Sequence, residues 1–296
     1  LTETFSVRSA DGTSSTVVIT INGTNDTAVI SAGSGAVTED VGVVAGNLVT
    51  GGTLTVTDPD AGESSFQAQS TAGAYGSFTL GVDGVWSYTA SNANPAIQAL
   101  GRGDVLTETF SVRSADGTSS TVVVTINGTN DGPVANGDAF STNEDVALTI
   151  AVSSLLANDT DLDGDSLVIT SVQGAVRGSV ALVGGNVVFT PEAEYSGPAS
   201  FTYTVSDGQG GSSTATVNIT VNPVNDPPTA AGGAVTGTED TPLLIDWAAL
   251  GVGDVDSSTL SIELTALPAD GTVQVFNGTA WVSASAGQVI SRADID

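Results

Sequence analysis

Oxygen-bearing side chains recur along this chain at fixed distances. The dipeptide Asn-Asp closes three similar stretches, and a glutamate follows each of these aspartates after 13 residues. The three sets are Asn25-Asp26 with Glu39, Asn130-Asp131 with Glu144, and Asn225-Asp226 with Glu239. Carboxylate and amide oxygens are hard ligands, and among the divalent cations they favour calcium. Calcium is therefore the partner that we expect first.

The composition excludes several other chemistries. The chain has no His, Cys or Met, and its five basic residues are all arginine. Without His or Cys there is no His-assisted triad, no thiolate nucleophile and no ordinary zinc site. Carboxylate catalysis would need two acids facing each other across a cleft. Because near-identical units suit length and stiffness better than a unique pocket, we expect no enzyme.

The charge balance limits the possible partners. A formal net charge of −28 opposes binding to nucleic acids and to anionic membranes. Bound cations would relieve the repulsion among so many carboxylates. No apolar run approaches the ~20 residues that span a bilayer, and the first residues carry no signal-peptide pattern. Because the chain does not begin with Met, we expect it to be an internal piece of a longer protein.

The chain is a tandem repeat. Residues 1–26 return at 106–131 with one change, from Ile19 to Val124, and a diverged third copy occupies 201–226. The Asn-Asp dipeptides lie 105 and 95 residues apart, and a period near one hundred is a whole domain rather than a solenoid turn. We expect units at 27–131 and 132–226, the end of a preceding unit at 1–26, and an incomplete unit at 227–296.

Alternating apolar and polar residues predict strands in every unit. Residues 215–221 alternate strictly, and a turn at Asp207-Gly208 joins them to the alternating run 201–205. Matching turns occur at 11–12 and 116–117, and an earlier hairpin recurs at 78–88, 180–188 and 273–281. The only helical candidate is 95–100. About seven strands in ~100 residues predict an all-β chain of immunoglobulin-like antiparallel β-sandwiches.

The motifs also resemble known families. Residues 1–131 look like VCBS repeats, with LTETFSVRSADGTSSTVVVTINGTND as the closing signature. Residues 132–226 resemble the bacterial cadherin-like tandem repeat through GPVANGDAFSTNEDVALTI, LLANDTDLDGDSL, FTYTVSDGQGG and VNPVNDPP, and 227–296 begins another. Such repeats form the extender region of large RTX-type adhesins that Gram-negative bacteria export by type I secretion. The resemblance implies cadherin-like sandwiches on the bacterial cell surface, acting as a spacer for a distal binding module in adhesion and biofilm formation.

The acidic residues are expected to meet at the joints between units. In such a sandwich the turn before the last strand lies near the preceding Asn-Asp, which brings Asp207 towards Asn130-Asp131 and Asp116 towards Asn25-Asp26. Thirteen extended residues span up to ~43 Å, so the glutamates should reach the following joint. The resemblance implies that an Asp-X-Asp sequence early in each unit faces the joint before it. The expected calcium ligands are Asn25, Asp26, Asp58, Asp60 and Asp116 at the first joint, Glu39, Asn130, Asp131, Asp161, Asp163 and Asp207 at the second, and Glu144, Asn225, Asp226, Asp254 and Asp256 at the third.

Other patterns have plainer explanations. Asp, Asn and Gly are common turn formers, so the acidic loops could be ordinary turns. Residues 159–165 resemble the opening of an EF-hand loop, but its twelfth position is Thr170 rather than Glu. The tripeptide Arg102-Gly103-Asp104 matches an integrin-recognition sequence, which we attribute to chance. Three tryptophans leave a carbohydrate-binding module as an alternative function; they are Trp86, Trp247 and Trp281.

The two ends of the chain raise one more alternative. A lone hairpin at 1–26 and an open sandwich at 227–296 would each expose apolar faces. Together they make 96 residues, close to the 95-residue unit. Identical subunits could therefore join head to tail into a filament by strand addition. A window cut from one long covalent array is the simpler expectation, because the two ends resemble different repeat types.

Overall fold

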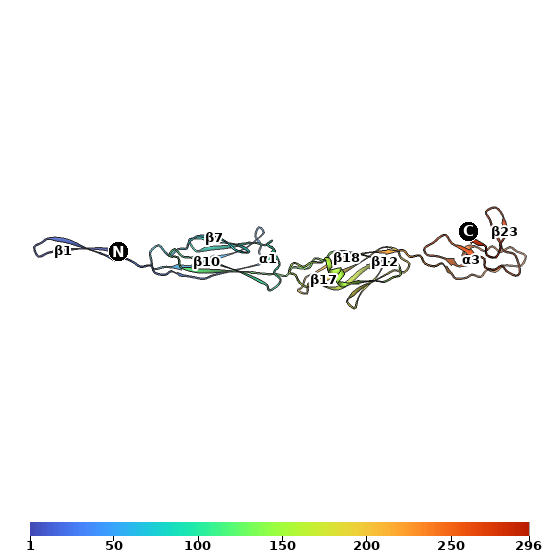
Figure 1. Ribbon diagram of the computed structural model, residues 1–296, viewed down its shortest axis with the longest axis horizontal. Coiled ribbons are helices and arrows are strands. Elements are labelled where there is room, and N and C mark those ends of the chain that lie inside the picture. Colours follow the sequence, from blue (N-terminus) through green and yellow to red (C-terminus); the bar gives the residue numbers. More distant parts are fainter. Residues whose placement is uncertain (296) are drawn as a thin grey trace. The chain divides into compact units, whose positions relative to one another are not determined.

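The computed structural model describes residues 1–295, which are mostly β-strands (Figure 1). They form two compact units. The first contains residues 1–136, 152–171 and 203–215, and the second contains 137–151, 172–202 and the residues from 216 onward. Each unit is described by itself.

The first unit begins with a two-stranded hairpin. Strands β1 (Thr2–Arg8) and β2 (Ser14–Thr20) pair only with each other, and all their residues are exposed. The turn between them has Gly12 at a φ of 92°, a conformation that glycine adopts without a steric penalty. The apolar side chains of the hairpin are exposed as well; Phe5 and Ile19 are 48% and 46% exposed.

A β-sandwich follows the hairpin in the first unit. One sheet has the order β5-β9-β8-β7, the other β10-β11-β4, and β3 pairs with β6. Figure 1 shows β7 and β10 in separate layers with α1 at one end. The elements are β3 (Val29–Ile30), β4 (Gly33–Thr38), β5 (Asn47–Thr53), β6 (Val56–Thr57), β7 (Gln69–Ala72), β8 (Gly76–Leu80), β9 (Val85–Ser91), α1 (Pro95–Gln98), β10 (Val105–Arg113) and β11 (Ser119–Asn127).

Aromatic and branched side chains fill the space between these two sheets. Phe78 and Phe110 stack with ring centroids 4.7 Å apart, and Tyr88 and Val122 beside them are fully buried. Burying each such side chain stabilises the fold by roughly 1.5–3 kcal/mol. The alternation read from the sequence therefore marks the core face of each strand.

The elements between residues 138 and 222 again form two sheets. One sheet has the order β12-β18-β17-β14 and another has β13-β16-β15. In the second unit Phe189 and Phe201 are fully buried, with ring centroids 6.1 Å apart. The elements are β12 (Asp138–Asn143), β13 (Leu148–Ala151), α2 (Val152–Leu155), η1 (Leu156–Asn158), β14 (Val168–Val176), β15 (Gly178–Val183), β16 (Asn186–Pro191), β17 (Gly197–Ser206) and β18 (Ser212–Asn222).

The predicted all-β class is confirmed, and two details differ from the prediction. The pairing is not antiparallel throughout, because β4 runs parallel to β11 and β12 runs parallel to β18. A parallel pair needs a long connection, and the intervening strands supply it. The single predicted helix is present as α1, where the Asn94 side chain accepts a hydrogen bond from Ala96 N. The short elements α2, η1, α3 (Trp247–Leu250) and η2 (Arg292–Asp294) were not predicted, since a single turn has no detectable periodicity.

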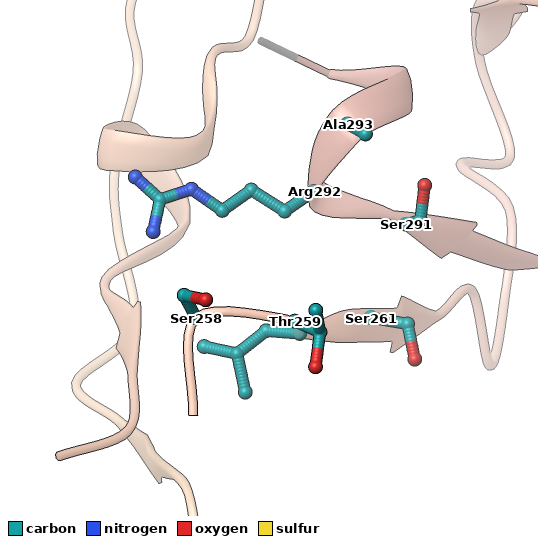
Figure 2. Close-up of a pocket in the computed structure, with 7 residues that line it drawn as sticks. Ser258, Thr259, Ser261, Ser291, Arg292 and Ala293 are labelled. Atoms are coloured by element: carbon teal, nitrogen blue, oxygen red, sulfur yellow. The ribbon is translucent and has the colours of Figure 1, made fainter. Parts of the chain in front are cut away.

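The strands in residues 227–295 of the second unit are short and lie in two-stranded pairs. Few side chains are buried there; they include Trp247 and Ile290. A cavity of about 440 Å³ lies beside the β21–β24 pair, and Figure 2 shows Arg292 extending over Ser258 at its edge. The strands are β19 (Thr229–Ala230), β20 (Val252–Gly253), β21 (Ser261–Glu263), β22 (Gln274–Phe276), β23 (Trp281–Ser283) and β24 (Val289–Ser291). Within residues 1–295, no helix has the length and apolar character to cross a membrane.

Candidate metal centres

The three Asn-Asp dipeptides are held in the same way. We call their surroundings the N-terminal joint (Asn25-Asp26), the central joint (Asn130-Asp131) and the C-terminal joint (Asn225-Asp226). At each joint the aspartate N–H donates to the second carboxylate of an Asp-X-Asp sequence. The donor and acceptor pairs are Asp26–Asp60 at 2.7 Å, Asp131–Asp163 at 2.7 Å and Asp226–Asp256 at 2.5 Å. The Asp-X-Asp loop of each expected unit is therefore attached to the dipeptide before it.

Glu39 is the most deeply buried acid of the central joint. It follows β4, is 0% exposed, and its N–H donates to Asn127 O at 2.9 Å. Its carboxylate accepts hydrogen bonds from Gln98 Nε2 at 2.8 Å and Thr129 N at 3.4 Å. Burial raises the pKa of Glu39 to about 7, and repulsion from Asp131 and other nearby carboxylates adds to this effect. An ionised Glu39 therefore needs a positive partner.

Asp207 reaches the central joint from the turn between β17 and β18. Its carboxylate accepts hydrogen bonds from Asn130 Nδ2 at 2.9 Å and from the N–H groups of residues 209–211. The hydrogen bond from Asn130 is the main cause that lowers the pKa of Asp207. Asp207 is thus kept ionised although only 4% of it is exposed.

Two groups of acids lie at the central joint. Glu39, Asp40 and Asp131 each place a carboxylate oxygen within 4.8 Å of the other two, and Asp161, Asp163 and Asp165 do the same. Four buried oxygens here have no hydrogen-bond partner: Asn130 Oδ1, Asp131 Oδ2, Asp161 Oδ2 and Asp163 Oδ1. Burying an unpaired polar atom costs free energy, and clustered carboxylates also repel one another. A hard cation with six to eight oxygen ligands fits this donor set.

The N-terminal joint gathers a smaller acidic group. Asp58, Asp60 and Glu63 lie within the same 4.8 Å limit, and buried oxygens of Asp58 and Glu63 have no hydrogen-bond partner. Asp116 accepts a hydrogen bond from Ala28 N at 3.1 Å, beside the Asn25-Asp26 dipeptide. Burial raises the pKa of Glu63, with further repulsion from Asp58, Asp60 and Asp116. The carboxylate of Asp26 is not part of this group.

The C-terminal joint gathers Asp145, Glu194 and Asp226 within 4.8 Å of one another. Asp226 Oδ2 is buried without a hydrogen-bond partner, and the close approach of the Asp226 carboxylate is the main cause that raises the pKa of Glu194. Glu144 is 4% exposed and accepts from Val224 N at 2.6 Å. Glu144 and Asp254 lie outside the acidic group, and Asp254 instead accepts from Asp256 N at 2.9 Å.

Five acids in these groups were missed by the sequence reasoning: Asp40, Glu63, Asp145, Asp165 and Glu194. Asp40 and Asp145 follow the recurring glutamates, and both adopt left-handed backbone angles, with φ of 55° and 58°. Such a φ is uncommon outside glycine and often marks a functional position. The recurring Glu-Asp dipeptide was visible in the sequence and would have identified these two residues.

The structure also shows where the EF-hand-like loop at 159–165 and the three tryptophans lie. Asp165 joins an acidic group, whereas Asp159 lies outside it and accepts from Asn136 N at 2.7 Å. Trp86 and Trp247 are 3% and 5% exposed and belong to cores. Trp281 is 54% exposed and contacts Phe276 with ring centroids 5.5 Å apart. Two of the three tryptophans therefore have no free face for a sugar.

Comparisons with solved structures find cadherin repeats. The cadherin domains 1–5 of protocadherin gamma B2 align over 100% of this chain and 59% of theirs, with 14% identity and a TM-score of 0.43. Human mucin-like protocadherin domains 1–2 align over 67% and 99%, with 17% identity and a TM-score of 0.41. An endo-fucoidan hydrolase of glycoside hydrolase family 107 aligns with a TM-score of only 0.21 at 18% identity. Scores this low carry no argument about function, and this chain spans 59% of the protocadherin gamma B2 structure.

Family comparisons are more informative. Residues 25–128 match the model of the bacterial cadherin-like domain, and residues 129–222 match that of the cadherin-like domain. No curated protein matches the sequence. Domains of these families are extracellular, non-enzymatic β-sandwich modules that usually bind calcium. The chain therefore carries two tandem cadherin-like domains, of which the first is of the bacterial type.

Proposed function

We propose that this chain is an extender segment of a large bacterial surface adhesin, in which calcium at the joints stiffens tandem β-sandwiches. The units would be a closing hairpin at 1–26, sandwiches at 27–131 and 132–226, and an opening sandwich at 227–296. One observation supports the proposal most directly. Acidic residues from the segments before and after an Asn-Asp dipeptide lie close together, and buried oxygens among them have no hydrogen-bond partner. The VCBS resemblance of 1–131 supports an RTX-type protein secreted by the type I route, with a role in adhesion and biofilm formation.

The chain's own residues would hold the cation from two sides at the central joint. Glu39, Asp40 and Asp131 would contribute from the first sandwich, and Asp161, Asp163 and Asp207 from the second, with Asn130 between them. When bound, calcium neutralises these carboxylates and links the loops that carry them. Without it, like charges within 4.8 Å of one another repel, and the joint would act as a hinge. The same reasoning applies to the residues of the other two joints.

Small-angle scattering combined with thermal unfolding of the 296-residue chain tests this proposal. We expect calcium to increase the maximum dimension, reduce flexibility and raise the unfolding temperature, and we expect a chelator to reverse all three effects. Asp131→Asn should weaken the calcium response, whereas Asp83→Asn, which removes one charge from the turn between β8 and β9 and lies outside the acidic groups, should not. If calcium changes neither shape nor stability, the acidic loops are ordinary turns and the proposal fails.

A second candidate function is a filament built from subunits of this chain. The observation in its favour is the exposed apolar face of the β1–β2 hairpin, whose counterpart at 106–131 is buried in a sandwich. Subunits would join head to tail, with the hairpin of one chain completing the open sandwich at 227–296 of the previous chain. Analytical ultracentrifugation over a range of concentrations distinguishes the two. Open-ended assembly supports the filament, and a monomer at every concentration excludes it.

A further inference from the structure

Four Asn-Gly dipeptides give the chain a chemistry that needs no enzyme. The backbone nitrogen of the glycine can attack Cγ of the preceding asparagine, which closes a succinimide ring and releases ammonia. Water then opens the ring to an aspartate or an isoaspartate. Glycine favours this reaction because it has no Cβ and is conformationally free. The dipeptides begin at Asn22, Asn127, Asn136 and Asn277, and all but the third are followed by threonine.

Donors surround the side-chain oxygen of Asn277. This dipeptide lies in the turn between β22 and β23, and both of its residues are exposed. Asn277 Oδ1 accepts hydrogen bonds from Thr279 N at 3.1 Å, from Thr279 Oγ1 at 2.9 Å and from Ala280 N at 2.9 Å. Attack on Cγ places a negative charge on this oxygen. The three donors are therefore arranged to stabilise that charge, as an oxyanion hole does.

The two nitrogens that take part in the reaction are accessible at this turn. Asn277 N–H donates to Ala280 O at 3.0 Å, and Gly278 follows with a φ of 88°. Among residues 1–295, no hydrogen bond engages the attacking Gly278 N or the leaving Asn277 Nδ2. A Cβ added at Gly278 would have no neighbouring atom within 4 Å. Packing therefore does not oppose ring closure.

The same tripeptide at 127–129 is held on both sides of the reaction. Asn127 Nδ2 donates to Val37 O at 3.1 Å, and Gly128 N donates to Asp104 O at 3.0 Å. The backbone of Gly128 is packed so closely that an added Cβ would overlap Leu100 O. Ring closure would have to break both hydrogen bonds and move a packed segment, so the fold protects Asn127.

Asn136 is also fixed, through its backbone and its side chain. Its N–H donates to Asp159 Oδ1 at 2.7 Å, its carbonyl accepts from the Tyr203 hydroxyl at 2.9 Å, and Nδ2 donates to Asn158 O at 2.8 Å. Succinimide formation requires rotation about the bonds of the asparagine, and these contacts oppose that rotation. Asn136 should therefore react slowly although it is exposed.

We propose that Asn277 is a site of spontaneous deamidation, at which donors from residues 279 and 280 activate the side-chain amide. The reaction replaces a neutral side chain by a negatively charged one at the tip of the β22–β23 hairpin. An isoaspartate product also lengthens the backbone by one methylene group beside the paired Phe276 and Trp281. This inference involves no calcium, so its failure and that of the proposed function are distinguishable.

Peptide mapping by mass spectrometry, after incubation of the folded 296-residue chain at mildly alkaline pH, tests the proposal. We expect conversion at Asn277 while Asn127 and Asn136 stay intact. Thr279→Val removes one donor and nearly keeps the side-chain shape, so it should slow the reaction at Asn277 by about fivefold. The matched control is Thr24→Val in the exposed tripeptide 22–24, where the Asn22 side chain makes no hydrogen bond among the described residues.

Incubation in urea separates the effect of the fold from that of the local sequence. Asn22, Asn127 and Asn277 share the sequence Asn-Gly-Thr, so their rates should become equal when the chain is unfolded. Thr279→Ser keeps the hydroxyl donor and should react like the unmodified chain. Conversion of Asn277 that is no faster than that of Asn127 in the folded chain overturns the site. An unchanged rate in Thr279→Val, relative to its rate in urea, overturns the activation by donors.

Discussion

The hairpins at 1–26 and 106–131 have nearly the same sequence but opposite surroundings. Both pair in the same register, with Phe5 opposite Val17 and Phe110 opposite Val122. Phe5 is 48% exposed, whereas Phe110 is 5% exposed and stacks on Phe78. The local sequence is therefore sufficient to set the turn, the pairing and the faces of a hairpin. Whether the apolar face is buried depends on the residues that come before it.

The largest expected difference between the two copies concerns these phenylalanines. Phe110→Ala should lower the free energy of unfolding of the first sandwich by about 3–5 kcal/mol, because it leaves a cavity in a packed core. Phe5→Ala should change it by less than about 0.5 kcal/mol. Urea unfolding followed by tryptophan fluorescence measures both, since Trp86 is in the affected core. Equal costs would show that the first hairpin is also buried in solution.

The next contrast is between Glu108 and Glu3, which occupy matching positions in the two copies. Glu108 is 7% exposed and accepts hydrogen bonds from Ala74 N at 2.5 Å, Tyr75 N at 3.2 Å and the Tyr88 hydroxyl. Glu108→Gln should cost about 1–3 kcal/mol, because an amide offers one acceptor oxygen where the carboxylate offers two. Glu3→Gln should be nearly neutral. A thermal unfolding series reports the difference, and a neutral Glu108→Gln would contradict the hydrogen bonding described here.

The buried hairpin at 106–131 ends beside Glu39, and the burial of this acid predicts that the stability of the fold depends on pH. With calcium chelated, the folded-state pKa of Glu39 is about 7, above its ordinary value, so the protonated form is favoured by folding. The stability that Glu39 contributes is fully present below its unfolded pKa and is lost as the pH rises through about 7. The expected change is on the order of 2 kcal/mol.

Unfolding temperatures between pH 5 and 8, in chelator, measure this dependence. Glu39→Gln should flatten the decline that the unmodified chain shows as the pH rises. Because calcium favours ionised carboxylates, the decline should disappear when the metal is added. Parallel curves for the two proteins in chelator would show that Glu39 keeps an ordinary pKa.

The smallest expected effect tests the one residue by which the two copies differ. Val124 is fully buried, so Val124→Ile adds a methylene group to a filled core and should cost about 1 kcal/mol. Ile19→Val, the reverse exchange in the exposed copy, should leave stability unchanged. Denaturant midpoints of both variants give the comparison. A stabilising Val124→Ile would mean that the core has room that the structure does not show.

Much of the local architecture was predictable from the sequence. The hairpins at 78–88 and 201–221, the short helix at 95–98 and the all-β class follow from alternation and turn residues, which act over a few neighbours. The spacing of Asn-Asp, Asp-X-Asp and Glu also identified most of the segments that carry the acidic groups, but not the segment of Glu194. The parallel pairing of β4 with β11 was not predictable, because alternation says nothing about which distant strand lies alongside.

The sequence by itself determined the repeat, the strand faces and the supply of oxygen ligands, since these depend on residue types at short range. Only the tertiary structure decided which acids share a group. It brought Asp40 to Asp131 and Glu194 to Asp226, and it left Asp26 and Asp254 outside the acidic groups. It also buried Glu39 completely and raised its pKa. The physical reason is that burial and charge repulsion depend on neighbours in space, and in this chain those neighbours are about 30 to 90 residues away in sequence.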